Sequence, residues 1–300
     1  MRAVVTGGAG FIGSHVVEAL LARGNEVTVV DDLSNGKREN VPDGARLVVA
    51  DVREGLVPLF EAASPEAVFH LAAQVDVRVS VERPDHDASV NVLGTVAVLE
   101  AARAVDAQVV FSSTGGAIYG ECDGPAPESA ERRPLAPYGV SKLAGEEYLA
   151  AYNRLYGTRH VSLRYGNVYG PRQDPHGEAG VVAIFLGALA AGQAPRVFGD
   201  GRQTRDYVYA GDVARASLAA AGQDGGVFNV GTGLETSVLE LYELSRKVAG
   251  SSLEAVEAPA RLGELQRSVL DVSLAERELG WRAEVPLEEG LRRTWEAIAS

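Results

Sequence analysis

The sequence predicts an α/β fold, with a doubly wound parallel sheet and a smaller α+β lobe. Two observations lead to this prediction. Within the first 165 residues, short runs rich in valine alternate with segments long enough to form helices. A glycine-rich turn also separates the first of these runs from the first helical segment. Strands joined through helices of this length pair in parallel, because each helix crosses over the sheet before the next strand begins.

The expected strands and helices follow from the spacing of apolar residues. In the first half we expect strands at residues 2–6, 26–30, 46–50, 67–71, 108–112 and 160–164. Amphipathic helices are expected at residues 13–22, 89–105 and 139–156. After residue 167 the pattern is less regular, with helices expected at 181–191, 236–249 and 274–279 and strands at 196–198 and 227–230. This second half should form the smaller lobe, over the carboxyl edge of the sheet.

Composition and charge exclude several classes of protein. The 300 residues are 46% apolar, which suffices for a sizeable core. The net charge of −13 argues against nucleic acid as a partner, since proteins that bind it present a basic face. The longest apolar run, residues 179–192, is shorter than the about 20 residues that span a bilayer, so no membrane segment is expected. Cys122 is the only cysteine and cannot form an internal disulfide, and we expect a cytoplasmic location.

Neither the histidines nor the paired glutamates predict a metal site. The five histidines lack the spacing of metal ligands, so no metal is expected. His70 ends a predicted strand and is expected to be packed rather than catalytic. Glu146 and Glu147 lie on the predicted helix at 139–156, where we expect both carboxylates to face solvent.

The glycine-rich turn predicts a site for a dinucleotide. Three glycines with the spacing G-x-x-G-x-x-G follow the first strand and open the first helix, at Gly7, Gly10 and Gly13. Glycine lets the chain turn sharply and lets a pyrophosphate approach the amides at a helix N-terminus. Asp31 and Asp32 end the second strand, where a carboxylate binds the adenosine ribose and repels a 2′-phosphate. The pattern therefore favours NAD over NADP, although Lys37 and Arg38 in the next loop would suit that phosphate.

A tyrosine and a lysine at i and i+4 are the candidate catalytic pair. Tyr138 and Lys142 lie on one face of the start of a predicted helix. A cation held beside a phenol favours the phenolate, so we expect Lys142 to lower the pKa of Tyr138. Such a phenolate can act as a general base for a hydroxyl group. Ser112, Ser113 and Thr114 follow the predicted strand at 108–112, and their hydroxyls could orient the same proton.

Nine motifs in one order give the chain a resemblance to a known family. They are TGGAGFIGSH (6–15), DDLSNGKREN (31–40), HLAAQ (70–74), NVLGT (91–95), SSTGGAIYGE (112–121), PYGVSK (137–142), RYGNVYGPRQDP (164–175), GDGRQTRDYVYAGDVA (199–214) and NVGTG (229–233). On these motifs the chain resembles the extended short-chain dehydrogenase/reductase family, and within it the UDP-glucose 4-epimerases. The likeness covers nearly the whole sequence and implies a Rossmann-like NAD-binding fold.

The resemblance implies an isomerase that interconverts UDP-glucose and UDP-galactose through a 4-keto sugar, with tightly bound NAD. Tyr138 would take the proton of the 4-hydroxyl, and Thr114 would hydrogen-bond the same oxygen, with Ser113 as its neighbour. Lys142 would bind the nicotinamide ribose. Residues 1–167, rejoined by about 206–233, would form the NAD-binding domain, and 168–300 mainly the substrate-binding lobe. The helices at 89–105 and 139–156 would form the interface of a homodimer, although burial in the core would give the same apolar pattern on these helices.

The binding residues are those that match the motifs of the family. The resemblance places next to the cofactor Gly7, Gly10, Phe11, Ile12, Gly13, Asp31, Asp32, Asn35, Asp51, Val52, Leu71, Ala72, Ala73, Gln74, Asn91, Ser112, Tyr138, Lys142 and Tyr165. It places next to the UDP-sugar Thr114, Tyr138, Asn167, Val197, Phe198, Arg205, Arg261, Glu264 and Ser268. The two arginines would offer forked donors to the diphosphate.

The sequence departs from the family at two places, and a third position bears on the choice of sugar. Val75 stands where many epimerases carry a lysine, and the stretch at Thr114 is one residue longer than the commonest form. Ser268 falls where the sugar pocket of the family carries either a bulky aromatic or a small residue. A small residue leaves room for an N-acetyl group, so an N-acetylhexosamine substrate is a further hypothesis.

Other functions on the same fold are a 4,6-dehydratase, a 4-ketoreductase and a non-catalytic NAD-binding regulator. Dehydratases of the family carry an acidic pair after the threonine, whereas Gly115 and Gly116 supply no carboxylate. A ketoreductase would consume reduced cofactor, and the two aspartates disfavour NADPH. A regulator would not need Thr114, Tyr138 and Lys142 together.

Overall fold

The computed structural model describes residues 1–175, 180–260 and 265–299, and seven parallel strands form its central sheet. Their order across the sheet is β11-β6-β5-β4-β1-β2-β3. Their bounds are β1 (Arg2–Thr6), β2 (Glu26–Asp31), β3 (Arg46–Val49), β4 (Ala67–His70), β5 (Gln108–Thr114), β6 (Val161–Tyr165) and β11 (Gly226–Val230). The chain leaves β1 first towards β2 and later towards β4, so the winding reverses between β1 and β4. The predicted doubly wound parallel sheet is confirmed.

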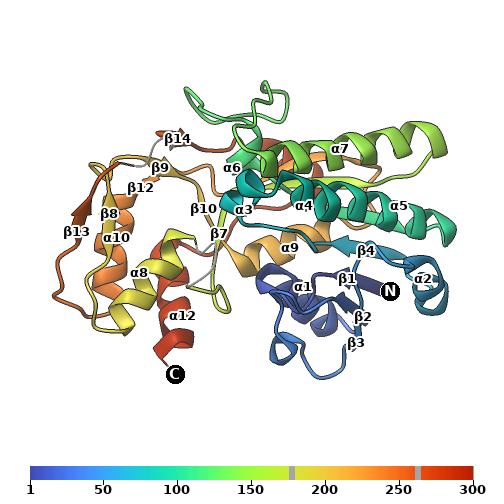
Figure 1. Cartoon of the computed structure of the whole chain (residues 1–300), viewed down its shortest axis with the longest axis horizontal. Helices are drawn as coiled ribbons and strands as arrows, with labels where there is room; N and C mark the ends of the chain where they lie inside the picture. The colour runs from blue at the N-terminus through green and yellow to red at the C-terminus, as the bar shows by residue number, and fades with distance from the viewer. Residues whose placement is uncertain (176–179, 261–264, 300) are drawn as a thin grey trace.

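Helices cover both faces of this sheet (Figure 1). One face packs on α1 (Phe11–Ala22), α9 (Ala210–Ala220) and α11 (Ser273–Leu279). The other packs on α2 (Leu56–Ala63), α5 (Gly94–Ala104) and α7 (Pro137–Tyr156). Side chains alternate between the faces along each strand: Val5 belongs to the first core and Val4 to the second. Because both faces are buried, the interior of a central strand such as β1 is a run of apolar residues, Ala3, Val4 and Val5.

Short helical segments connect the sheet to these layers. They are η1 (Arg38–Asn40), α3 (Val77–Glu82), α4 (Pro84–Ala88), the π-helical turn η2 (Ser89–Leu93) and α6 (Gly115–Ile118). The helix expected at 89–105 therefore begins with one wide turn and continues as α5. Asn91 lies in that turn, and π-helical turns of this kind often occur at functional sites.

The smaller lobe is built on three helices with their own apolar core. They are α8 (Val181–Ala190), α10 (Val238–Val248) and α12 (Leu287–Ala299), and their buried side chains include Phe185, Leu241 and Leu291. Short strands complete this part: β7 (Asn167–Tyr169) pairs with β10 (Tyr207–Tyr209), and β8 (Arg196–Phe198) pairs with β13 (Val256–Ala258). A third sheet has the order β12 (Thr236–Ser237), β9 (Thr204–Arg205), β14 (Arg267–Ser268).

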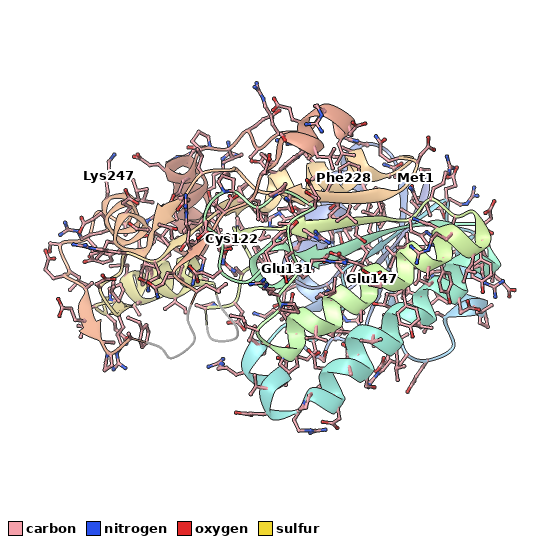
Figure 2. All side chains as sticks on the ribbon, turned by 90° about the horizontal axis from the view of Figure 1, so that it is seen from above. Met1, Cys122, Glu131, Glu147, Phe228 and Lys247 are labelled. Atoms are coloured by element: carbon pink, nitrogen blue, oxygen red, sulfur yellow. The ribbon has the colours of Figure 1, made fainter. Side chains whose placement is uncertain are left out.

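The two parts lie end to end. In Figure 2, Met1 and Phe228 mark the end that holds the large sheet, and Lys247 on α10 marks the opposite end. Figure 1 shows α6, β7 and β10 where the two parts meet. In the chain, α6 follows the carboxyl end of β5 directly, and β7 follows that of β6 after one residue. Within the described residues, none of the helices combines the length and the apolar character needed to cross a membrane.

Candidate active site

The glycine turn between β1 and α1 is packed so closely that it tolerates only glycine at two positions. Gly7 has φ +71°, and a Cβ there would lie 2.6 Å from the backbone nitrogen of Ala72. A Cβ on Gly13 would lie 2.1 Å from the carbonyl oxygen of Gly7. The turn leads into α1, and Gly10 is the residue that immediately precedes the helix. Its amides therefore lie at a helix N-terminus beside the point where the winding of the sheet reverses, which suits an anionic group.

Asp31, at the end of β2, is hydrogen-bonded to the glycine turn. Its Oδ2 accepts a hydrogen bond from the backbone N–H of Ala9 at 2.9 Å, and its Oδ1 accepts one from Leu33 at 2.9 Å. Burial raises the pKa of this carboxyl group. Asp32 and Asn35 are exposed, and Asp32 accepts hydrogen bonds from Ser34. Asp31 therefore fixes the shape of the turn and retains free lone pairs for a ligand.

Gln74, four residues after the end of β4, is hydrogen-bonded to Asn91 in the π-helical turn. The N–H of Gln74 donates to Oδ1 of Asn91 at 2.8 Å, and Nδ2 of Asn91 donates to the carbonyl of Gln74 at 2.9 Å. Both amide side chains also donate to Oδ1 of Asp87, at 3.0 Å each. These bonds hold the segment 71–74 against the start of α7, since Asn91 also donates to Oγ of Ser141 at 3.1 Å.

The other residues predicted for the cofactor are spread along the edges of β1, β3, β4 and β6. Asp51 is in an ion pair with Arg53 just after β3, and Val52 is buried. Phe11 and Ile12 form the first turn of α1, while Leu71 and Ala72 pack against the two cores of the sheet, and Ala73 is partly exposed. Tyr165 is buried, with its hydroxyl 3.1 Å from Oγ of Ser217. The side chain of Tyr165 therefore lies in the core under α9.

Tyr138 and Lys142 lie in the first two turns of α7. The ammonium of Lys142 donates to the carbonyl of Ser112 at 2.8 Å, which joins the helix to the carboxyl end of β5. Burial lowers the pKa of Lys142 to about 8, against the opposite effect of Asp87 and Glu146. Burial, together with the charge of Asp87, raises the pKa of Tyr138 above its usual value. The expectation that the pKa of Tyr138 is lowered is thus wrong for the protein alone, because burial and the charge of Asp87 both raise it.

The hydroxyls at the end of β5 point in different directions. Ser113 is buried and donates to Oε1 of Glu146, whereas Thr114 is half-buried. The expectation that Glu146 faces solvent is wrong: its side chain is 2% exposed and forms an ion pair with Arg164 at 2.6 Å. Glu147 is exposed and forms an ion pair with Arg132, as expected of a solvated residue.

The residues predicted for the sugar nucleotide lie on the short strands of the smaller part. Asn167 starts β7, and its Oδ1 would be 3.6 Å from a Cβ on Gly116, just beyond the end of β5. Arg205 on β9 and Ser268 on β14 are paired in register, and Ser268 is buried. Val197 and Phe198 lie on β8. Arg261 and Glu264 lie outside the described residues.

His70 is buried, as expected, but its hydrogen-bond partners and those of the buried Asp206 were not predicted from the sequence. His70 is linked to Thr6 at 2.7 Å and to Thr95 at 3.1 Å, which ties together the ends of β1, β4 and α5. Asp206 accepts hydrogen bonds from the N–H groups of Thr232 and Gly233, beside Arg205. Their partners are far away in the sequence, so no local pattern indicates them.

Comparison with known proteins places this site in a family. Residues 3–231 match the family model described as NAD dependent epimerase/dehydratase family. The UDP-glucose 4-epimerase of Mycolicibacterium smegmatis is 48% identical over 306 residues, which cover 99% of this chain and 98% of that protein. The structure of the UDP-glucose 4-epimerase of Thermus thermophilus in complex with NAD is 49% identical, with a TM-score of 0.94 and 99% of each chain covered.

A solved structure with a different substrate name is also similar. The UDP-N-acetylglucosamine 4-epimerase of Methanobrevibacter ruminantium, in complex with UDP-N-acetylmuramic acid, is 34% identical with a TM-score of 0.94. The match covers 99% of this chain and 97% of that one. Likeness over the whole length therefore extends to relatives named for two kinds of hexose.

Proposed function

The chain belongs to the NAD-dependent epimerase/dehydratase family, and we propose that it is a nucleotide-sugar 4-epimerase that interconverts UDP-glucose and UDP-galactose. One observation carries the proposal. Tyr138 and Lys142 lie together on α7, and Lys142 is bonded to the end of β5 that bears Thr114. A phenol, an ammonium and a hydroxyl at the carboxyl edge of such a sheet are the groups needed to move the proton of a carbinol.

NAD is the cofactor that the residues of the first half fit. The glycine turn offers amides at the N-terminus of α1, with no side chain on Gly7 or Gly13 to obstruct a pyrophosphate. Asp31 offers a carboxylate at the end of β2 for the ribose. We place the cofactor contacts on these residues and on the segment 71–74, with Lys142 at the nicotinamide ribose. When bound, oxidised NAD supplies a reversible acceptor for the hydrogen at C4 of the sugar.

The residues of the chain then handle the proton and the sugar. Tyr138 takes the proton of the 4-hydroxyl and later returns it, while Thr114 hydrogen-bonds the same oxygen. Tyr138 must be a phenolate to accept this proton, and the ammonium of Lys142 stabilises that form against the burial that raises the pKa of Tyr138. Arg205 and Arg261 would keep the diphosphate bound while the 4-keto sugar rotates and presents its opposite face to the cofactor site. The reaction has no net redox change.

We propose N-acetylated hexoses as additional substrates, because the residue at position 268 is small. Ser268 is a small residue on β14, paired in register with Arg205. A serine leaves more space next to the sugar than an aromatic residue would. The similarity to an epimerase named for UDP-N-acetylglucosamine points in the same direction.

Dehydration is disfavoured by packing as well as by composition. A Cβ on Gly115 would lie 2.6 Å from Cδ2 of Leu270, which is buried. An acidic side chain at position 115 would therefore require Leu270 to move. The 4-ketoreductase and the regulator remain as outcomes of the test below.

We further propose that residues 1–167 and about 206–233 bind NAD, that 168–300 mainly bind the sugar nucleotide, and that the protein is a cytoplasmic homodimer. α5 and α7 run side by side along one edge of the molecule (Figure 2). Apolar side chains are exposed along this edge, among them Leu93, Val140 and Tyr148. A groove of about 430 Å³ between α4 and α7 is lined by Val92, Leu135 and Val140. Apolar area of this kind on two neighbouring helices suits an isologous contact.

The test is to incubate the purified protein with UDP-galactose and look for UDP-glucose, with and without added NAD. The same assay with UDP-N-acetylglucosamine decides whether N-acetyl groups are accepted. Tyr138→Phe should keep the fold and NAD binding but lose at least about 10²-fold in turnover. A requirement for reduced cofactor would indicate a ketoreductase, and a 4-keto-6-deoxy product a dehydratase. NAD binding without any turnover would overturn the proposal in favour of a regulator.

A further inference from the structure

A buried chain of polar groups lies behind the catalytic ends of β5 and α7. Ser113 donates to Glu146, and Glu146 accepts from Nε and Nη2 of Arg164 at 2.9 Å and 2.6 Å. The side chains of Glu146 and Arg164 are 2% and 3% exposed. Glu146 follows Tyr138 and Lys142 at intervals of four residues, so the three share one face of α7.

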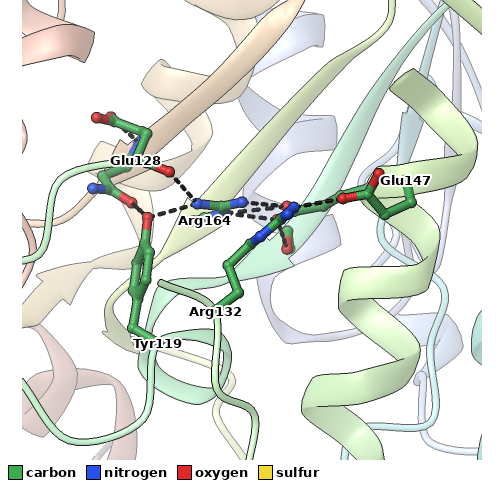
Figure 3. A network of polar contacts seen from close by, with 8 residues as sticks. Tyr119, Glu128, Arg132, Glu147 and Arg164 are labelled. Carbon is green, nitrogen blue, oxygen red and sulfur yellow. Dashed lines mark hydrogen bonds and ion pairs between the residues drawn. The ribbon is translucent and has the colours of Figure 1, made fainter. Parts of the chain in front are cut away.

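The chain continues from Arg164 to the segment that follows Ser268. Arg164 donates from Nη1 to the hydroxyl of Tyr119 at 2.8 Å and to the carbonyl of Glu128 at 3.0 Å (Figure 3). Burial raises the pKa of Tyr119 to about 12, so this hydroxyl keeps its proton and donates it to Oδ1 of Asn229 at 2.8 Å. Nδ2 of Asn229 in turn donates to the carbonyl of Asp271 at 2.9 Å.

A gain in stability does not explain why the ion pair of Glu146 and Arg164 is buried. Removing two charges from water costs about as much as their attraction returns, and an apolar pair of similar size is often at least as stable. A fully hydrogen-bonded network does restrict geometry, because each member has fixed donors and acceptors. Here the restricted elements are β5, which bears Thr114, and α7, which bears Tyr138.

We propose that Glu146 and Arg164 are positioning residues that act through Ser113 to fix the spacing between Thr114 and Tyr138. Successive side chains of a strand point to opposite faces, so the bond from Ser113 to Glu146 directs Thr114 the other way, towards the ligand. Ser113 thereby serves as a positioning residue and does not contact the sugar. A displacement of about 1 Å between reacting groups can cost about 10²-fold in rate. The inference rests on the proposed epimerase function.

The experiment compares turnover of UDP-galactose by the NAD-loaded protein and four variants. Ser113→Ala removes the hydroxyl without leaving a charge unpaired, and Ser113→Thr restores a hydroxyl. The double change Glu146→Leu with Arg164→Met replaces the whole ion pair with apolar groups, so that it does not strand a buried charge. Glu147→Gln is the matched control, since Glu147 is the exposed neighbour of Glu146 and pairs with Arg132.

We expect Ser113→Ala and the double variant to melt within a few degrees of the wild type, to lose about tenfold or more in kcat, and to keep KM within about twofold. Ser113→Thr should recover most of the kcat, and Glu147→Gln should match the wild type. A folded double variant with the kcat of the wild type, or with a higher KM and an unchanged kcat, would overturn the positioning role. The proposed epimerase function would stand. If the double variant does not fold, Ser113→Ala against Ser113→Thr decides. An inactive wild type would instead remove the proposed function and this inference with it.

Discussion

The backbone N–H of Ala9 donates a 2.9 Å hydrogen bond to Oδ2 of Asp31, so the acid at the end of β2 holds the glycine turn of β1 in place. The same carboxylate accepts the N–H of Leu33 through its other oxygen. β1 and β2 are adjacent and parallel, which brings the two ends together. Asp31 therefore has a structural task besides the ribose contact proposed for it.

Asp31→Asn should lower both stability and NAD retention. An amide has one acceptor oxygen, so one of the two N–H donors would face an NH₂ group. Leaving one such donor unsatisfied costs about 1–3 kcal/mol. Urea unfolding and the absorbance of copurified NAD measure the two effects. Asp43→Asn is the control, because Asp43 is exposed, lies in the loop before β3 and is not among the residues predicted to contact the cofactor. Equal losses in both variants would contradict the bracing role.

Lys142→Met should give a more stable protein at pH 7 that no longer turns over substrate. The native pKa of Lys142 is lowered from 10.5 to about 8 by burial, so keeping the charge inside the protein costs free energy. That cost exceeds the lost bond to the carbonyl of Ser112, and we expect a net gain of about 1–2 kcal/mol. Thermal and urea unfolding at pH 7 test the gain, and a loss of stability would count against it.

The same shift predicts how the advantage of Lys142→Met depends on pH. Between pH 8 and 10.5 the unfolded chain holds a proton on Lys142 that the native protein has released. The stability of the wild type relative to the variant therefore rises with pH across this window. Catalysis should behave in the opposite way, since kcat/KM needs the ammonium and should fall above about pH 8. A profile that keeps rising to pH 10 would show that the charge is not required.

The fold could largely be predicted from the sequence where both faces of a strand are buried. β1, β2 and β4 are apolar on both faces because helices cover both sides, and their positions agree with the prediction to within one residue. Helices α9 and α12 were not predicted. Five of the eleven residues of α9 are alanine, and few large apolar residues mark its period, while α12 carries many charges between its buried positions.

The candidate site was predictable only where its groups are local in sequence. The residues of the glycine turn lie within a few positions of one another, and so do Tyr138 and Lys142, so their spacing alone indicates them. Glu146 was assigned to solvent because its partner Arg164 lies on β6, and only the folded sheet brings them together. The pKa of Tyr138 was misjudged for a related reason: burial is a property of the tertiary structure.

His70 should remain neutral throughout the range in which the enzyme works. The hydroxyl of Thr95 donates to the carbonyl of Asn91 at 2.6 Å, so Nε2 of His70 must donate to Thr95, and Nδ1 accepts from Thr6. Burial lowers its pKa from 6.5 to about 3, so native stability falls as the pH drops from 6.5 towards 3. Proton and nitrogen resonances of the ring, assigned with a His70→Asn spectrum, should show one tautomer and no titration between pH 5 and 8. A midpoint near pH 6 would contradict this arrangement.

The proposed dimer predicts that charges on the exposed edge of η2 and α7 separate the protomers. Leu93 is 62% exposed and Tyr148 is 42% exposed. Glutamates at both positions would lie in the apolar interface. The twofold axis would bring the glutamates of one protomer close to those of its partner, and their like charges would repel. Sedimentation velocity should show a dimer for the wild type and a monomer for Leu93→Glu with Tyr148→Glu. Leu234 is 69% exposed on the other lobe, so Leu234→Glu should leave the dimer mass unchanged. A monomeric wild type would rule out the dimer.

Ser268→Tyr should restrict the enzyme to hexoses without an N-acetyl group. In the proposed pocket Ser268 lines the sugar, and its register partner Arg205 binds the diphosphate that carries this sugar, so we expect a larger side chain at position 268 to occupy space beside the sugar. The ratio of kcat/KM for UDP-N-acetylglucosamine to that for UDP-glucose should fall at least about tenfold, which corresponds to about 1.4 kcal/mol of selective exclusion. Because Ser268 is only 6% exposed, Ser268→Cys, which keeps the small volume, controls for disturbed packing. An unchanged ratio in a folded Ser268→Tyr variant would place the N-acetyl group elsewhere, since a residue that lines its pocket cannot gain a ring without excluding it.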